Sequence, residues 1–105
     1  MNNNNIQNLL KQAQRIQSQV SRMQSELADR TVEATAGGGM VTAVVNGRQE
    51  LVSISIDPQV VDPEDVEMLE DLVVAAVSEA LTRAGEMAAE EMKRLTGGMP
   101  LPGLF

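Results

Sequence analysis

The residues of this 105-residue chain best suited to chemistry are three cations near its start, Lys11, Arg15 and Arg22. Their spacings of four and seven residues place them on one face of a helix, because successive helical residues turn by about 100°. Residues 1–30 hold four bases, including Arg30, and two acids, so this segment has a charge of +2 within a chain of net charge −7. Two interpretations are open: the cations keep a helix face solvated, or they contact an anionic partner.

Other residue types that support catalysis or metal binding are missing or poorly arranged. The chain has no Cys and no His, which excludes disulfides, thiolate metal sites and the commonest general base. Seven acids between Asp57 and Asp71 lack the spacing of a calcium loop and are interpreted as solvated or as complementing a helix dipole. The run Gly37–Gly39 is not followed by the lysine of a phosphate loop. We therefore predict no enzymatic activity, no cofactor and no metal.

The composition predicts one domain, spanning residues 1–105, with a core that lacks aromatic side chains. The only aromatic residue is Phe105, so the core must consist of Val, Leu, Ile, Ala and Met. Such a core buries little area per residue, and this favours oligomerisation. No apolar run is long enough to span a membrane and no basic-then-apolar signal begins the chain, so a soluble cytoplasmic protein without a membrane partner is expected.

An amphipathic helix is predicted from Ile6 to Leu27. Its apolar residues alternate in steps of three and four, which is typical of a narrow stripe that packs against another helix. The stripe consists of Ile6, Leu9, Ala13, Ile16, Val20, Met23 and Leu27. The three cations lie roughly opposite this stripe. Asn5 is a candidate N-cap, and residues 1–5 are expected to be flexible.

The middle of the chain predicts a three-stranded antiparallel sheet. The expected strands are Thr31–Ala36, Met40–Val45 and Gln49–Ile56. Gly37–Gly39 would form the first turn, and Asn46–Gly47 predicts a type I′ hairpin turn. Val52, Ile54 and Ile56 give the last strand one apolar face, which predicts a sheet covered on one side with at least one open edge.

A second long helix is predicted over Pro63–Leu95, capped by Asp62. Its first half is apolar over a wide face that should pack on the sheet. The residues of this face are Val66, Leu69, Leu72, Val73, Ala76, Val77, Ala80 and Leu81. Gly85 could bend or break the helix, and Gly97 should end it. The expected fold is therefore α+β, in the order α-β-β-β-α, with residues 97–105 flexible.

Several segments along the chain match the pattern of one protein family. They are Leu10–Gln14, Met23–Gln24, the glycine turn before Met40–Val41, Asn46–Gly47, Ile56–Pro58, Met68–Val73 with Ala75–Ala76, and Gly97–Met99 with Pro102–Gly103. In this order they resemble the YbaB/EbfC family of bacterial nucleoid-associated proteins. The resemblance covers essentially the whole chain. The chain departs from the family in starting with asparagines instead of glycines and in having an acidic second helix.

The resemblance implies a tweezers-shaped homodimer whose long helices project from a central body. It also implies binding of double-stranded DNA with little sequence demand, a place on the nucleoid, an influence on nucleoid organisation and gene expression, and no small-molecule substrate. DNA contact is attributed to the projecting helices, which implicates Lys11, Arg15 and Arg22. The remaining candidate DNA-binding residues are Arg30, Arg83, Lys93 and Arg94.

The expected mechanism is contact with phosphates, since no aromatic residue is available for base stacking. A dimer with two copies of the three cations would neutralise about six phosphates. The alternative is a protein-interaction module that docks a partner on the heptad helix or the acidic second helix. Binding that depends on the first-helix cations would favour DNA, whereas dependence on the apolar and acidic surfaces would favour the module.

Overall fold

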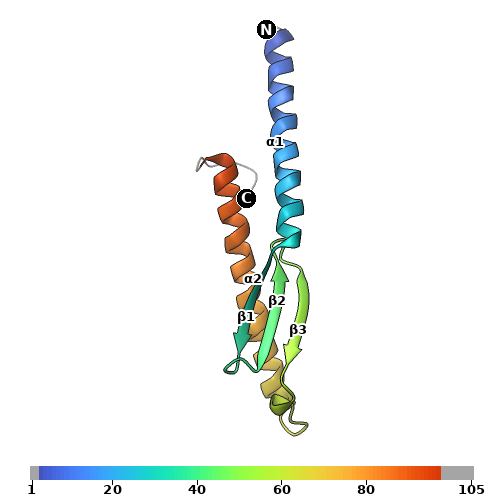
Figure 1. Ribbon diagram of the computed structural model, residues 1–105, viewed down its shortest axis with the longest axis vertical. Helices are drawn as coiled ribbons and strands as arrows, with labels where there is room; N and C mark the ends of the chain where they lie inside the picture. Colours follow the sequence, from blue (N-terminus) through green and yellow to red (C-terminus); the bar gives the residue numbers. More distant parts are fainter. Residues whose placement is uncertain (1–2, 98–105) are drawn as a thin grey trace.

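Two long helices and a three-stranded antiparallel sheet make up the computed structural model, which describes residues 3–97 (Figure 1). In chain order the elements are α1 (Asn3–Asp29), β1 (Thr31–Ala36), β2 (Val41–Asn46), β3 (Leu51–Ile56), a 3₁₀ turn (Pro58–Val60) and α2 (Val66–Thr96). This confirms the predicted α+β fold and its α-β-β-β-α order. The flexibility expected of residues 98–105 and 1–2 concerns positions outside the described residues.

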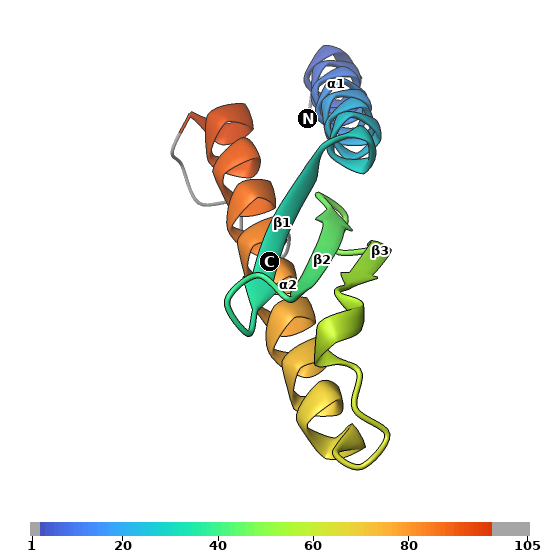
Figure 2. The same cartoon turned by 60° about the horizontal axis from the view of Figure 1, so that its bottom comes forward.

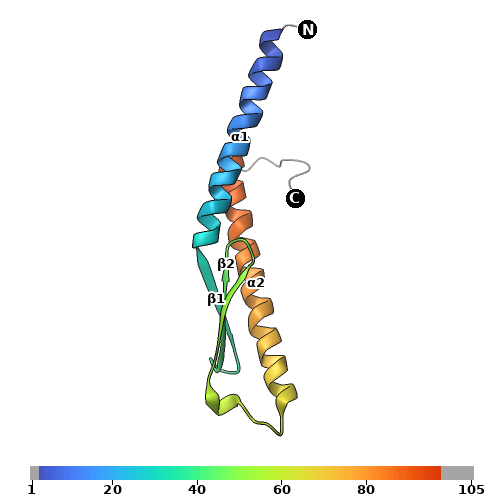
Figure 3. The same ribbon diagram turned by 90° about the vertical axis from the view of Figure 1, so that its right-hand side faces the viewer.

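The core lies between α2 and the first two strands. The sheet has the order β1-β2-β3, and β1 and β2 contribute Ala34, Val41, Ala43 and Val45 to the core. From α2, the fully buried residues Ala76, Ala80 and Ala84 face them. These small side chains recur every four residues, so they form one line along the helix and let its backbone approach the sheet. The predicted packing of α2 on the sheet is confirmed, and Figure 3 shows the two layers edge-on.

The third strand is left uncovered. Ile54 pairs with Ala43, and Ile56 with Val41, so both lie on the sheet face that α2 packs against. However, α2 lies over β1 and β2, and every residue of β3 is exposed (Figure 2). The prediction that this apolar face is covered is therefore correct for two strands and wrong for β3.

The β2–β3 hairpin has the predicted position but not the predicted turn. Gln49, with φ 61°, is the residue of this turn in the left-handed region, and Gly47 is not. The Gly47 N–H instead donates to the carbonyls of Leu27 and Arg30, both at 2.9 Å. A Cβ on Gly47 would lie 2.7 Å from the Leu27 carbonyl oxygen. The glycine is thus required by the close approach of α1, and the type I′ prediction is wrong.

The helix boundaries also differ from the predictions. Helix α1 begins at Asn3, so Asn5 lies inside it and does not cap it. Helix α2 begins at Val66 and is capped by Asp65, whose carboxylate accepts from the Met68 N–H at 3.2 Å. The predicted cap, Asp62, instead holds the preceding turn by accepting from the Glu64 N–H.

Helix α2 runs without a break to its left-handed C-cap, Gly97, as predicted for its end. Of the predicted bend or break at Gly85, the break is absent, because one helix spans this position. Gly85 has a packing role instead, because the Gln49 amide lies 3.2 Å from where its Cβ would be. The same amide donates to the Leu81 carbonyl at 3.2 Å and so ties the β2–β3 turn to α2.

Helix α1 projects from the body and gives the molecule extents of 73 × 21 × 18 Å. Only its C-terminal part is packed: Met23 and Leu27 are buried against Met92 of α2. Towards the N-terminus the apolar stripe is exposed, with Ile6 at 42% and Ile16 at 44%. The predicted helix partner is therefore present within the chain for only the last part of the stripe.

Candidate nucleic-acid interface

The three predicted cations of α1 are all available to a partner. Lys11, Arg15 and Arg22 are exposed, and among residues 3–97 none of them has an ion pair or a side-chain hydrogen bond. They share one face of an unbroken helix, so their spacing is fixed by the helix backbone. The N-terminal part of α1 extends beyond the end of α2 (Figure 1), and Lys11 and Arg15 precede Gln19, the first α1 residue that lines a groove with α2.

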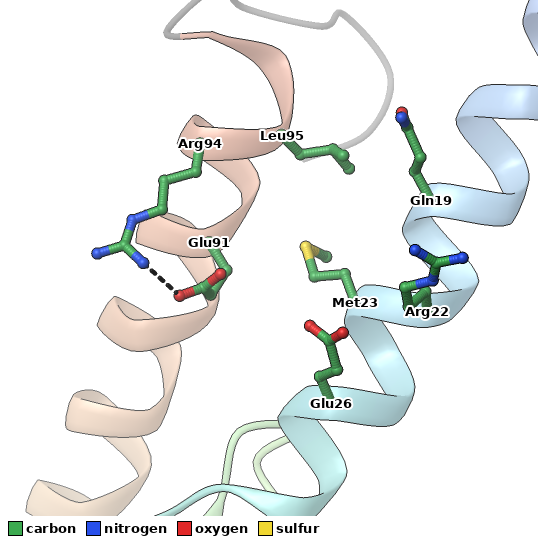
Figure 4. Close-up of a pocket in the computed structure, with 7 residues that line it drawn as sticks. All are labelled: Gln19, Arg22, Met23, Glu26, Glu91, Arg94 and Leu95. Atoms are coloured by element: carbon green, nitrogen blue, oxygen red, sulfur yellow. Dashed lines mark hydrogen bonds and ion pairs between the residues drawn. The ribbon is translucent and has the colours of Figure 1, made fainter.

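Arg22 lies where α1 meets α2. The two helices enclose an open groove of about 300 Å³. It is lined by Gln19, Arg22, Met23 and Glu26 of α1 and by Glu91, Arg94 and Leu95 of α2 (Figure 4). The groove therefore brings together two of the predicted DNA-binding cations, Arg22 and Arg94, from opposite ends of the sequence.

A single carboxylate, that of Glu91, pairs with Arg94 and with a further predicted cation, Arg30. Glu91 Oε1 lies 2.8 Å from Nη1 of Arg30 and 3.1 Å from Nη1 of Arg94. The Glu91 side chain is 21% exposed, whereas the side chains of Arg30 and Arg94 are 50% and 75% exposed. Arg30 directly follows α1, so the pair with Glu91 ties the base of α1 to α2.

The remaining two predicted cations lie apart from this groove. Arg83 pairs with Glu79 at 3.2 Å and donates to the backbone carbonyl of Glu33 at 2.7 Å, which places it beside β1 on the body. Lys93 is exposed near the end of α2, has no ion pair among the described residues and does not line the groove. The structure thus brings Arg22, Arg30 and Arg94 to one region and leaves Arg83 and Lys93 outside it.

One further cation, Arg48, was missed by the helical pattern because it lies in the β2–β3 turn. Its side chain is exposed and has no partner among residues 3–97. Its backbone N–H donates to the Asn46 side chain at 3.0 Å. Gly47 and Gln49 tie the same turn to α1 and α2, respectively. The signal that could have identified Arg48 from the sequence is its position directly after Asn46–Gly47, which predicted a turn.

The described residues offer cations and little other reactive chemistry. Within residues 3–97 no three His, Cys, Asp or Glu side chains are grouped so that they could hold a metal ion. Over the same range, neither helix combines the length and the apolar character needed to cross a membrane. The interface can bind anions through Arg and Lys side chains, which are the groups that proteins use for phosphate.

Known proteins resemble the chain over nearly its whole length. The model of the YbaB/EbfC DNA-binding family, which is a binding family and not a class of enzymes, matches residues 1–99. A nucleoid-associated protein of Thermoanaerobacter pseudethanolicus is 63% identical, over 96% of this chain and 91% of that protein. One from Pelotomaculum thermopropionicum is 55% identical, over 96% of both chains.

The fold has also been seen in a solved structure. An uncharacterized protein from Helicobacter pylori superposes with a TM-score of 0.75 and 24% identity, over 92% of this chain and 99% of that one. This similarity supports the fold, while the family model and the closely similar relatives establish the family. The chain belongs to the YbaB/EbfC DNA-binding family.

Proposed function

We propose that this protein is a nucleoid-associated protein that binds duplex DNA as a homodimer, through contacts from α1 cations to phosphates. The observation that carries the proposal is the exposed and unpaired state of Lys11, Arg15 and Arg22, among the described residues, on a projecting helix. The DNA-binding family and the nucleoid-associated relatives support it. The protein would act on the nucleoid in the cytoplasm and influence nucleoid organisation and gene expression.

The net charge of −7 is compatible with this function because charge is separated along the molecule. The acids between Asp57 and Asp71 lie in the segment that joins β3 to α2 and at the start of α2, at the end of the 73 Å molecule away from the α1 N-terminus (Figure 1). Salt screens charges over about 8 Å at physiological ionic strength. DNA near Lys11 and Arg15 is therefore shielded from the acidic end.

The available chemistry favours duplex phosphates over bases. The chain has a single aromatic residue, Phe105, so it lacks the stacking platforms typical of proteins that bind single strands. Lys and Arg contacts to phosphates carry no direct sequence information. We therefore expect binding with little sequence preference and strong salt dependence.

A second copy of the chain is the best occupant for the exposed apolar surfaces. Val52, Ile54 and Ile56 of β3 are 56%, 38% and 38% exposed, on an edge strand whose outer backbone groups have no strand partner in the described chain. Exposed edges and apolar patches of this kind are commonly buried by self-association. Only three large side chains are fully buried among the described residues, so one copy has a small core.

The exposed surface continues from β3 onto α2. Val74, Leu81 and Gly85 are spaced by seven and four residues and so share one side of α2, the side that Gln49 of the β2–β3 turn contacts. Val74 is 64% exposed on that side. A partner that covers β3 would also cover this part of α2. Two copies would offer six α1 cations. The logarithm of the DNA-binding constant should then fall with the logarithm of the salt concentration with a slope of about −5.

Fluorescence anisotropy of a labelled duplex over a salt series tests the proposal. The variant Lys11→Gln, Arg15→Gln, Arg22→Gln should lose most of the affinity and of the salt dependence. A matched control, Ala75→Glu, Thr82→Glu, Ala89→Glu, changes the net charge by the same −3 at exposed positions spaced by seven residues, on the face of α2 away from the sheet. This control should bind much more tightly than the α1 variant.

The outcomes separate the two functions considered. An equal loss of duplex affinity in both variants would mean that the affinity depends only on the net charge, and this would contradict the α1 site. Binding that survives the α1 substitutions would move the site to cations such as Arg48 and Lys93. If the wild type fails to bind duplex DNA even at low salt, the DNA function is wrong and a protein-interaction module, docking on the exposed stripe of α1, becomes the better explanation.

A further inference from the structure

One acidic side chain in the α1–α2 region occupies a position that a phosphate could take. Glu91 is the acceptor for two guanidinium groups, those of Arg30 and Arg94, at 2.8 and 3.1 Å. Guanidinium groups bind carboxylates and phosphates with the same planar geometry. Arg22, whose side chain is unpaired among residues 3–97, lines the groove beside this cluster.

We propose that Glu91 acts as an internal substitute for a DNA phosphate, and that a phosphate displaces it from Arg30 and Arg94 when DNA lies along the groove between α1 and α2. This inference rests on the proposed DNA-binding function and extends its site from α1 to the end of α2. Glu91 then lowers the affinity for DNA, because the two arginines must break their ion pairs with the Glu91 carboxylate before they bind a phosphate.

The exposure of the three side chains makes this exchange feasible. Half or more of the Arg30 and Arg94 side chains are in contact with solvent, whereas Glu91 is largely covered. Exposed ion pairs are weak, so a phosphate, which also offers charged acceptor oxygens, can compete with the carboxylate. Glu26 is the other carboxylate that lines the groove, and it has no ion pair among the described residues.

The chain contains a matched control for Glu91. Its neighbour Glu90 is exposed and has no ion pair among residues 3–97. Glu91→Gln and Glu90→Gln both remove one negative charge from the same turn of α2. Only the first releases Arg30 and Arg94. A difference in DNA affinity between the two variants therefore measures the effect of releasing the two arginines, and not the effect of removing one negative charge.

Anisotropy with a labelled duplex across a salt series should show tighter binding by both variants than by the wild type. Glu91→Gln should bind about tenfold more tightly than Glu90→Gln at low salt, with a salt dependence steeper by about 1 to 2. Replacing the two arginines as well, in Glu91→Gln, Arg30→Gln, Arg94→Gln, should abolish this gain. The melting temperatures of both single variants should stay within about 5 °C of the wild type, since only exposed pairs are lost.

Each outcome bears on one proposal. If the wild type binds DNA and the two single variants are indistinguishable, Glu91 does not compete with phosphate, while the proposed function stands. Weaker binding by Glu91→Gln at an unchanged melting temperature would show that Glu91 positions the arginines for DNA, which contradicts competition. If no variant binds DNA at low salt, the proposed function itself fails.

Discussion

At the scale of single residues, pairing divides the cations of this chain into two groups. Lys11, Arg15 and Arg22 have no partner among the described residues, whereas Arg30 and Arg94 share Glu91. A free cation gains a phosphate without losing another contact. A paired cation must first give up its carboxylate. The same residue type therefore contributes unequally to affinity according to its neighbours.

The absence of a side chain at Gly47 allows the β2–β3 turn to approach the end of α1 closely. In Gly47→Ala the new Cβ would lie 2.7 Å from the Leu27 carbonyl oxygen and 2.8 Å from its Cδ2 atom, so α1 or the turn must move. We expect a loss of about 2–3 kcal/mol in the free energy of unfolding, measured by urea denaturation at fixed protein concentration.

Gly38→Ala is a suitable comparison for this prediction. Gly38 has φ +68°, and no atom lies within 4 Å of the position that a Cβ would take there. Alanine at this position therefore meets only the left-handed backbone penalty of about 1 kcal/mol. Equal losses in the two variants would show that the approach of α1 to Gly47 is not tight in solution.

At the scale of elements, α1 is anchored at one end and free at the other. Leu27 is 1% exposed in a small cluster with Met23 and Met92, whereas Leu10 is 58% exposed. Leu27→Ala should reduce the free energy of unfolding by about 2–4 kcal/mol because it leaves a cavity in this cluster. The identical change Leu10→Ala should alter it by less than about 0.5 kcal/mol. Urea denaturation of both variants tests this, and similar losses would mean that α1 is packed along its whole length.

The element order and much of the site geometry could be predicted from periodicity. Spacings of three and four residues located both helices and placed the three α1 cations on one face. The type of the β2–β3 turn was predicted wrongly, because Gly47 is set by the close approach of Leu27, which is distant in sequence. The contact between Gly85 of α2 and the Gln49 side chain likewise joins residues that are distant in sequence. The Arg30–Glu91 pair spans 61 residues, and no local pattern reports such a contact.

The apolar pattern of β3 shows why part of the packing could not be predicted from one chain. Alternation in β3 correctly indicated an apolar face, but the pattern does not say which molecule covers it. Within the described chain α2 packs over β1 and β2, and every residue of β3 stays exposed. The stripe of α1 presents the same situation, with Leu9 58% exposed.

At the scale of the whole molecule, an elongated chain with a small core leaves its main apolar face at the edge of the sheet. The shape separates this face from the cationic part of α1, which lies towards the other end of the 73 Å axis (Figure 1). A substitution on β3 can therefore alter assembly without touching the α1 cations themselves. A second copy docked on β3 would double the number of α1 cations in one particle without covering those of the projecting segment.

A charge placed on the apolar face of β3 should separate the two copies. In Ile54→Glu a carboxylate would have to be buried in the proposed interface, which should weaken dimerisation at least about 100-fold and yield monomers in sedimentation equilibrium. Ser53→Glu adds the same charge to the neighbouring residue, on the opposite face of the same strand, and should remain dimeric. The monomer keeps three α1 cations instead of six, so its salt dependence for duplex binding should fall to about half that of the wild type.

If Ile54→Glu assembles as well as Ser53→Glu, this face of β3 is not the interface. If it is monomeric but keeps the full salt dependence, one copy already makes all the phosphate contacts, and the paired arrangement of α1 helices proposed for DNA binding is wrong.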